Sequence, residues 1–390
     1  MEVFMGAAVT SGANQEVIPF LDLGLSAEYE LVRSIRVVSK SQRRKVGILK
    51  TDVNINGGMD FQRRQPIPSW QVVDELRKQY EIVEVSADAD YPSDLDVLLA
   101  VLPSSLGQPQ MDRLQKYMLT GKKTMLLCDA LPIDMVQLSP SQRHKPAQDP
   151  RMGGGNAAGA VKGNISKLLN DVGISFKSNE VVWSSSNPYP MFERLPQEIT
   201  FSQQSNGEFT QQSKISSGLQ VVLSMFPGHL NKADKGWAEF TPIYSVDSGN
   251  HGIINWSQLV ANSYMGAQVK PEAQYQHLRA QHKGPLNLAA HVVGSRQLNA
   301  TLDKDGKETA PAQKESVDVI VFSDIDFISD RFFSIRREGW QNLTLDNVTI
   351  FLNAIDFLTG DKEFVELRKK RKNHRTLTKF DVIRRQLDGQ

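Results

Sequence analysis

Two carboxylates close an apolar stretch near the end of the chain. Val317–Phe322 is apolar except for Asp318, and Asp324 and Asp326 follow it directly. Such a run predicts a buried strand, and side chains two residues apart in an extended strand share one face. We therefore expect both carboxylates to lie together at one edge of a sheet.

Two further aspartates, Asp52 and Asp129, also follow predicted strands. Open α/β sheets bind ligands outside the carboxyl ends of their strands, and carboxylates gathered there could hold Mg²⁺ or Ca²⁺, or face a basic partner. The simpler interpretation, which the sequence favours, is that each aspartate caps a turn or a helix. With two serines that follow another strand, the expected binding edge consists of Ser104, Ser105, Asp129, Asp324 and Asp326. No metal is predicted there.

A cysteine nucleophile is the second chemical possibility. Cys128 lies at the predicted end of a strand, and four histidines could in principle assist it: His144, His229, His251 and His291. A nucleophile elbow requires small neighbours, whereas Leu127 and Asp129 flank this thiol, and a carboxylate opposes thiolate formation. The favoured interpretation is a small apolar strand residue.

Composition limits the classes of function. The 390 residues are 40% hydrophobic and 23% charged, with a net charge of +1. These values are typical of a globular protein and provide no general positive field for nucleic acid. A single cysteine excludes an intramolecular disulfide and a cysteine-based zinc cluster. No run approaches the ~18 apolar residues of a membrane span. We expect no cofactor and no nucleic-acid partner.

Strands and helices alternate along most of the chain. The spacing of apolar residues predicts strands over Val46–Leu49, Glu81–Val85, Leu95–Leu102, Thr124–Cys128 and Val317–Phe322, and helices over Ser26–Lys40, Trp70–Tyr80, Met111–Leu119, Ile165–Val172 and Asn347–Leu358. This order favours an α/β fold with a doubly wound, mostly parallel sheet and helices on both faces. Short alternating runs over Asn187–Pro271 indicate a β-rich insertion.

These patterns suggest a division into five parts. A lead-in segment with a helix (1–44) precedes the first part of the α/β domain (45–186), the β-rich insertion or subdomain (187–315) and the returning strand and helix (316–360). The last part, 361–390, is a basic tail. Its cations are expected to lie near a membrane, where each would contribute ~1 kcal/mol at an anionic surface; a solvated face is the alternative. They are Arg368, Lys369, Lys370, Arg371, Lys372 and Arg375.

Aromatic residues in the β-rich region raise a third possibility, sugar binding. It depends on Trp183, Tyr189, Trp237 and Trp256. Core packing explains such residues equally well.

Two segments carry a family resemblance. In Leu95–Asp129, a strand leads into Pro103-Ser-Ser-Leu106, and a helix and a second strand follow. Val317–Arg375 contains Phe322-Ser-Asp-Ile-Asp-Phe327, Phe351-Leu-Asn-Ala-Ile-Asp-Phe-Leu358 and the basic run. Together they resemble the auxiliary component of an uncharacterised ABC-type transport system, a group that includes gliding-motility auxiliary proteins. The similarity extends roughly from Val46 to Arg375.

The resemblance implies a flavodoxin-like or class I glutamine-amidotransferase-like domain, related to the GIFT domain of intraflagellar transport proteins, without assigned catalytic residues. It implies a place in the bacterial cell envelope, on the extracytoplasmic side of the inner membrane. The implied partners are ABC permease and ATPase subunits or other envelope proteins, with membrane association through flanking helices that this sequence lacks.

The expected function is therefore non-enzymatic binding of a protein or an envelope component. One alternative is a hydrolase or amidotransferase-like enzyme that uses Cys128 or a divalent metal at Asp324 and Asp326. The other is a carbohydrate-binding module.

Overall fold

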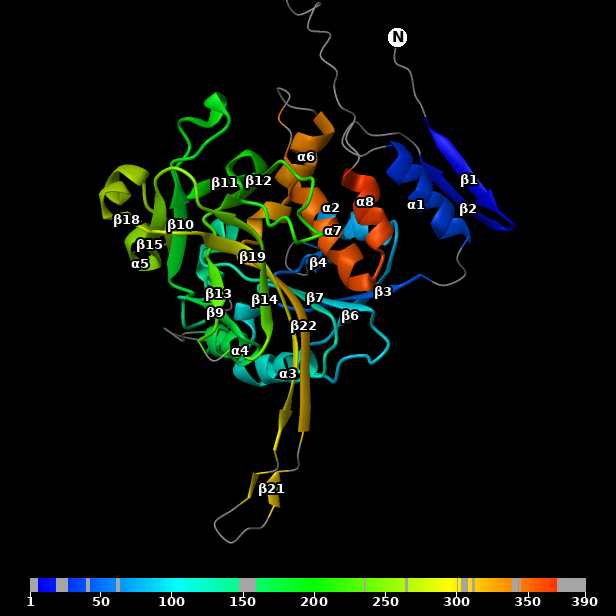
Figure 1. Cartoon of the computed structure of the whole chain (residues 1–390), viewed down its shortest axis with the longest axis horizontal. Helices are drawn as coiled ribbons and strands as arrows, with labels where there is room; N and C mark the ends of the chain where they lie inside the picture. The colour runs from blue at the N-terminus through cyan, green and yellow to red at the C-terminus, as the bar shows by residue number, and fades with distance from the viewer. Residues whose placement is uncertain are drawn as a thin grey trace, which may run out of the picture.

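The computed structural model of the chain describes residues 6–18, 27–39, 43–60, 64–146, 159–234, 236–263, 266–299, 301–302, 308–310, 313–338, 343 and 345–369. Figure 1 gives the arrangement of its helices and strands.

A nine-stranded central sheet organises the described residues. Its strands are β3 (Lys45–Leu49), β6 (Glu81–Val85), β7 (Val97–Val101), β8 (Thr124–Leu127), β9 (Ile174–Phe176), β13 (Leu230–Lys232), β14 (Glu239–Val246), β19 (Leu286–Leu298) and β22 (Gln313–Phe322). They lie in the order β6, β3, β7, β8, β22, β19, β13, β9, with β14 also paired to β19.

The sheet has a parallel and an antiparallel part. β6, β3, β7, β8 and β22 pair in parallel, whereas β19, β14, β13 and β9 pair antiparallel. The predicted α/β class is confirmed, and so are the strands of the parallel part. The sequence does not predict the antiparallel part, because β13, β14 and β19 come from the segment expected to form an insertion.

Helices cover both faces of the parallel part (Figure 1). In full, the helices of the described residues are α1 (Ala27–Ser39), α2 (Gln71–Arg77), α3 (Gln108–Met118), α4 (Ile165–Asp171), α5 (Trp256–Leu259), α6 (Asp330–Glu338), α7 (Asn347–Thr359) and α8 (Lys362–Lys369). α2 and α7 pack against the face that carries Leu99, and α3 and α4 pack against the face that carries Leu98. This alternation explains why β7 reads as a continuous apolar run: both of its faces are buried.

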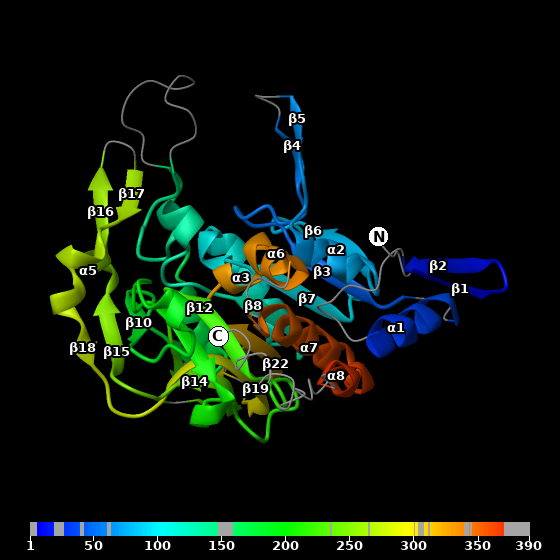
Figure 2. The same cartoon turned by 90° about the horizontal axis from the view of Figure 1, so that it is seen from above.

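Six small sheets surround this core in the described part of the chain. They pair β1 (Ala7–Ser11) with β2 (Asn14–Ile18), β4 (Gly58–Asp60) with β5 (Gln65–Ile67), β11 (Ile199–Gln203) with β12 (Val221–Met225), β16 (Val260–Ser263) with β17 (Gly266–Val269) and β20 (Thr301–Leu302) with β21 (Glu308–Ala310), and they join β10 (Glu180–Ser184), β15 (His251–Asn255) and β18 (Ala280–Gln281). Figure 2 shows the β4–β5 and β16–β17 hairpins projecting from the same side of the molecule.

One ribbon extends far beyond the sheet. β19 and β22 remain paired from Ala289 and Phe322 out to Leu298 and Gln313, whereas β14 accompanies β19 only as far as Val293. The outer end of this pair stands clear of the body in Figure 1.

Candidate functional site

Three of the predicted aspartates meet at the carboxyl edge of the parallel strands. β8 and β22 pair in parallel with Leu127 opposite Phe322, so the residues that follow them emerge side by side. Asp129, Asp324 and Asp326 each bring a carboxylate oxygen within 4.8 Å of the others. We call these residues the carboxylate cluster. The sequence prediction that Asp324 and Asp326 lie together is confirmed, and Asp129 joins them.

The carboxylate cluster is buried and accepts hydrogen bonds from backbone amides. Asp129 accepts from the amides of Leu131 at 2.7 Å and Ile325 at 3.0 Å. Asp324 accepts from the amide of Met225 at 2.8 Å and from that of Asp326 at 2.7 Å.

Asp326 completes this pattern by accepting from the amide of Ile133 at 2.8 Å. The carboxylates thus connect the loops after β8, β12 and β22. This is the capping role that the sequence analysis favoured.

Burial and mutual repulsion change the acidity of all three groups. Loss of water raises the pKa of Asp129, and the neighbouring Asp326 and Asp324 raise it further. The pKa of Asp324 is raised by burial first and by Asp326 second. Burial raises the pKa of Asp326 to about 7. Carboxylates this close share protons, because three adjacent negative charges in a buried site are costly.

The two serines of the expected binding edge are also buried. Ser105 donates from its hydroxyl to the carbonyl of Leu102 at 2.9 Å and accepts from the amide of Asp52 at 3.2 Å. Ser104 is 2% exposed. Asp129 and Asp324 are 0% exposed and Asp326 is 3% exposed. The sequence-based expectation of an exposed edge is therefore wrong, because all five residues are buried. Ser105 and the three carboxylates bond within turns inside the fold, whereas the Ser104 hydroxyl has no hydrogen-bond partner among the described residues.

Asp52 stays apart from the carboxylate cluster. Its carboxylate pairs with the ammonium group of Lys145 at 2.9 Å. Lys162 is buried and donates to the carbonyls of Leu138 at 3.1 Å and Ser139 at 2.6 Å. Burial lowers the pKa of Lys162 to about 8, against the opposing effect of Asp52. The predicted acidic quartet is thus a trio and a separate ion pair.

Cys128 lacks the features of a nucleophile. The thiol is 1% exposed, and burial, followed by the charge of Asp129, raises its pKa far above the ordinary value. The histidines that might assist it are engaged elsewhere: His144 with the carbonyl of Gly159, His229 with Glu180, His251 with the carbonyl of Gly284 and His291 with Asp318. The interpretation of Cys128 as a strand-end apolar residue fits this environment.

The basic run begins inside the protein. Arg368 is 7% exposed, and its guanidinium lies 2.6 Å from the carboxylate of Asp356. Both interpretations of Arg368, a cation near a membrane or one on a solvated face, required an exposed side chain. That exposure is wrong, because helix α8 carries Arg368 into a buried ion pair. Lys369 ends α8. Lys370, Arg371, Lys372 and Arg375 lie outside the described residues.

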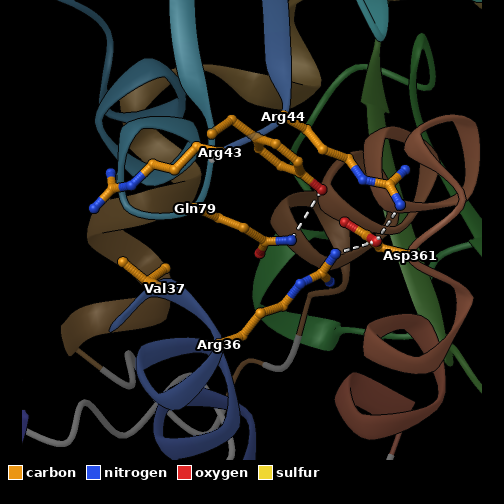
Figure 3. A pocket seen from close by; sticks show the side chains of 7 residues that line it. Arg36, Val37, Arg43, Arg44, Gln79 and Asp361 are labelled. Carbon is orange, nitrogen blue, oxygen red and sulfur yellow. Dashed lines mark hydrogen bonds and ion pairs between the residues drawn. The ribbon is translucent and has the colours of Figure 1, made fainter. Parts of the chain in front are cut away.

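A second ion-pair group lies beside α8, around Asp361. Figure 3 shows Arg36 and Arg44 converging on Asp361, while Gln79 donates to Tyr80. The cavity between these side chains has a volume of about 20 Å³. That space admits about one water molecule. The group is thus a structural joint between α1, the start of β3 and α8, not a ligand site.

An open hollow lies between β10 and β11. Its volume is about 510 Å³, and it is lined by the residues that connect the two strands, from Ser184 to Phe201. We call it the β10–β11 hollow. Three aromatic rings, Tyr189, Phe192 and Phe201, pack together there with centroids 5.7–6.0 Å apart. A volume of this size is typical of small-molecule sites.

Of the aromatic residues proposed for sugar binding, Tyr189 alone lines this hollow. Trp183 and Trp256 are buried, and the indole of Trp183 donates to the carbonyl of Ala280 at 3.2 Å. Trp237 donates to the carbonyl of Asp171 at 3.2 Å and lies under the guanidinium of Arg296. These three serve packing, as the alternative interpretation held.

Sequence reasoning missed the β10–β11 hollow. The available signal was Pro188-Tyr-Pro190 followed by Phe192, an aromatic pair beside two prolines in the segment that connects β10 to β11. Binding residues concentrate in such connections, because a rigid scaffold fixes both ends. The sequence does not reveal that the connection folds back to enclose a volume.

Comparison with known proteins gives one family. Residues 43–354 match the model of a family described as ABC-type uncharacterized transport system. No curated protein matches the chain. In the described part of the chain, every helix is too short or too polar to cross a membrane.

Similarity to solved structures is remote. A ThuA-like protein from Bacteroides uniformis is 8% identical, with a TM-score of 0.31; the match covers 82% of this chain and 92% of that protein. A GH42 β-galactosidase from G. stearothermophilus is 10% identical, with a TM-score of 0.27 and coverage of 74% and 42%. A β-galactosidase from Halorubrum lacusprofundi is 12% identical, with a TM-score of 0.25 and coverage of 74% and 43%. The chain spans less than half the length of these β-galactosidases.

Proposed function

This chain belongs to the family of ABC-type uncharacterized transport system auxiliary proteins, and we propose that it is a non-enzymatic component of such a system. In this proposal the domain lies on the extracytoplasmic side of the bacterial inner membrane. Its partners are the ABC permease and ATPase subunits or other envelope proteins. It acts by binding, and the binding surface is the β10–β11 hollow.

The contrast between the β10–β11 hollow and the buried groups carries this proposal. The residues that could perform hydrolysis, Cys128 and the carboxylate cluster, are buried and engaged with backbone amides or apolar neighbours. The hollow is open, by contrast, and it has a volume of about 510 Å³. Accessible volume without a reactive group suits recognition better than catalysis.

The order of the parallel strands supports the flavodoxin-like topology that the resemblance implies. In chain order, β6, β3, β7, β8 and β22 are the second, first, third, fourth and last strands of the parallel part. The order 2-1-3-4-5 is that of flavodoxin-like sheets. Such folds serve many functions, so the topology supports the class of fold and leaves the function to the site.

Co-isolation from bacterial cells tests the proposal. A tagged form of the full protein is expected to co-purify with an ABC permease and its ATPase from solubilised membranes. In spheroplasts, the domain is expected to be cleaved by an externally added protease that leaves cytoplasmic proteins intact. Recovery in the cytoplasmic fraction, without a permease, would contradict both the location and the partners.

A further inference from the structure

We propose that the β10–β11 hollow binds a neutral saccharide. The proposal deepens the proposed function and rests on it: the ligand of the transport auxiliary would be an uncharged, polyhydroxylated molecule of more than one sugar ring. Four features of the hollow support this class of ligand: its size, its charge, its aromatic wall and its free hydrogen-bonding groups.

Size excludes the smallest ligands. A volume of about 510 Å³ lies within the range of ~300–1,000 Å³ seen for sites that enclose whole small molecules. A single ammonium group, which aromatic side chains also recognise, would leave most of this space empty.

Charge excludes anions. The lining contains no lysine, arginine or histidine, and Glu193 is its single acidic residue. A phosphate or a sugar acid would therefore meet no cation and one like charge, which disfavours binding. Glu193 is exposed at the rim, where water screens its attraction for cations.

The aromatic wall offers an apolar face. Tyr189 and Phe192 are half-buried, and Phe201 beneath them is 1% exposed. Phe192 stacks on Phe201, with 16° between the ring planes. The rings are held in place by one another and retain partly exposed surface. A sugar ring presents a face of C–H groups that packs on such a surface, while its hydroxyls point outward.

Hydrogen-bonding groups surround this wall. The hydroxyl oxygen of Ser185 accepts from the amide of Asn250 at 3.0 Å, and that of Ser186 accepts from the side chain of Gln203 at 3.0 Å. Within the described residues, neither hydroxyl hydrogen has an acceptor. The side-chain oxygen of Asn187 accepts from the backbone amide of Tyr189 at 2.9 Å. The side-chain NH₂ group of Asn187 remains as a donor. These neutral groups match the hydroxyls of a sugar.

The walls are fixed before any ligand arrives. The amide of Ser184 donates to the carbonyl of Gln197 at 2.8 Å, which closes the two ends of the connection. The next residue, Glu198, is buried and forms a bidentate ion pair with Arg279, at 2.8 and 2.9 Å. A preorganised site loses less conformational entropy on binding.

Titration of the purified chain tests the ligand class. The neutral probes are maltotriose, cellotriose and N,N′,N″-triacetylchitotriose; the charged comparators are spermidine and trigalacturonic acid. At least one neutral probe is expected to bind in calorimetry and to show saturation transfer from protein to ligand in NMR. Neither charged comparator is expected to bind.

Variants place the binding in the β10–β11 hollow. Tyr189→Ala and Phe192→Ala are each expected to weaken the affinity about tenfold, as for the loss of one aromatic contact. Met191→Ala is the matched control, because Met191 lies between two lining residues, is 43% exposed and does not line the hollow. The Met191→Ala variant should bind the neutral probe with the affinity of the wild type.

Three results would overturn the proposal. The first is that no neutral probe binds the folded chain. The second is that the Tyr189→Ala and Phe192→Ala variants bind as tightly as the wild type. The third is that spermidine binds the wild type and that Glu193→Gln abolishes this binding. Each result leaves co-isolation with the permease unaffected. Failure of the ligand class is thus distinct from failure of the proposed function.

Discussion

The guanidinium of Arg368 lies 2.6 Å from the carboxylate of Asp356, and 1% of either side chain is exposed. The phenol of Tyr29 accepts a hydrogen bond from the same guanidinium, and that of Tyr80 donates to the same carboxylate. Asn353 adds an amide oxygen that accepts from Arg368 at 3.1 Å. This group joins α1, α7 and α8 through one buried ion pair.

Removal of Arg368 should therefore destabilise the domain strongly. Arg368→Ala leaves the Asp356 carboxylate buried without its cation, so the free energy of unfolding should fall by about 3–5 kcal/mol. Chemical denaturation measures this change. Glu363→Ala, an exposed position on the same helix, is the control and should change it by less than about 0.5 kcal/mol. Equal stability of both variants would contradict the role of the ion pair.

Stability should decrease as the pH rises through neutrality. The pKa of Asp326 is about 7 in the folded protein, above its ordinary value, so the folded state holds a proton that the unfolded chain releases. Its contribution is complete below the unfolded pKa and is lost as the pH passes 7. The free energy of unfolding should be about 3 kcal/mol lower at pH 8 than at pH 5 from this group.

Asp326→Asn isolates that contribution. The amide oxygen still accepts from the amide of Ile133, but the side chain no longer ionises. The difference between the two pH values should therefore shrink by the amount that Asp326 supplies. An unchanged pH profile would show that Asp326 does not hold an additional proton in the folded state.

Asp324 should be required for stability. Asp324→Ala removes the acceptor of two buried backbone amides, those of Met225 and Asp326, so the free energy of unfolding should fall by about 2–4 kcal/mol. Asp324→Asn keeps an acceptor oxygen and should cost less. Thermal denaturation of both variants, compared with wild type, provides the measurement. A fully stable alanine variant would contradict the capping role.

Mg²⁺ and Ca²⁺ test the remaining enzymatic alternative. Because the carboxylate cluster is buried and holds protons, millimolar concentrations of either ion should leave the thermal transition at pH 6 unchanged. A ligand that binds only the folded state would raise the temperature of this transition. A clear upward shift, absent in Asp324→Asn, would favour a metal site and reopen the hydrolase hypothesis.

Cys128 should react slowly. Burial and the adjacent Asp129 raise the pKa of its thiol, so iodoacetamide at pH 8 should modify the native protein far more slowly than the unfolded protein. Mass spectrometry over time follows the modification. Rapid labelling of the native chain would identify an accessible thiolate.

Much of the core could be predicted from the sequence. β7 stands as a continuous apolar run, and Met125–Leu127 of β8 and Val317–Phe322 of β22 are apolar apart from Asp318. Parallel strands covered on both faces favour such runs. The predicted end of α7 is also confirmed: Gly360 caps it with a φ of 85°, a conformation that favours glycine.

The site was predictable only in part. The sequence predicts the proximity of Asp324 and Asp326 from an extended strand, but β22 ends at Phe322 and Ile325 adopts a helical conformation, so a turn brings the two carboxylates together. The pairing of β8 with β22 brings Asp129 to them. Their burial had no signal, because several of the amides that compensate them belong to segments distant in sequence, such as that of Met225 at the end of β12. Polarity alone predicts exposure.

The face of α1 shows a similar limit. Tyr29, Leu31, Ile35 and Val38 form its apolar positions in the sequence. Tyr29 and Val38 are buried, whereas Leu31 and Ile35 are 36% and 52% exposed. The buried face instead takes Arg33, at 5% exposure. Arg33 pairs there with Glu30 of the same helix at 2.7 Å, and Tyr29 accepts from Arg368 of α8. Helical periodicity does not record such polar contacts.

The buried contact between Arg368 of α8 and Tyr29 of α1 has a mechanical consequence. The direct hydrogen bond from Arg368 to Tyr29 links the first and last described helices across the interior. A force that separates these helices would load this short connection before it reaches the strands of the sheet. Under tension, the contact between α1 and α8 should therefore break first. The sheet and the β10–β11 hollow should stay intact under moderate load.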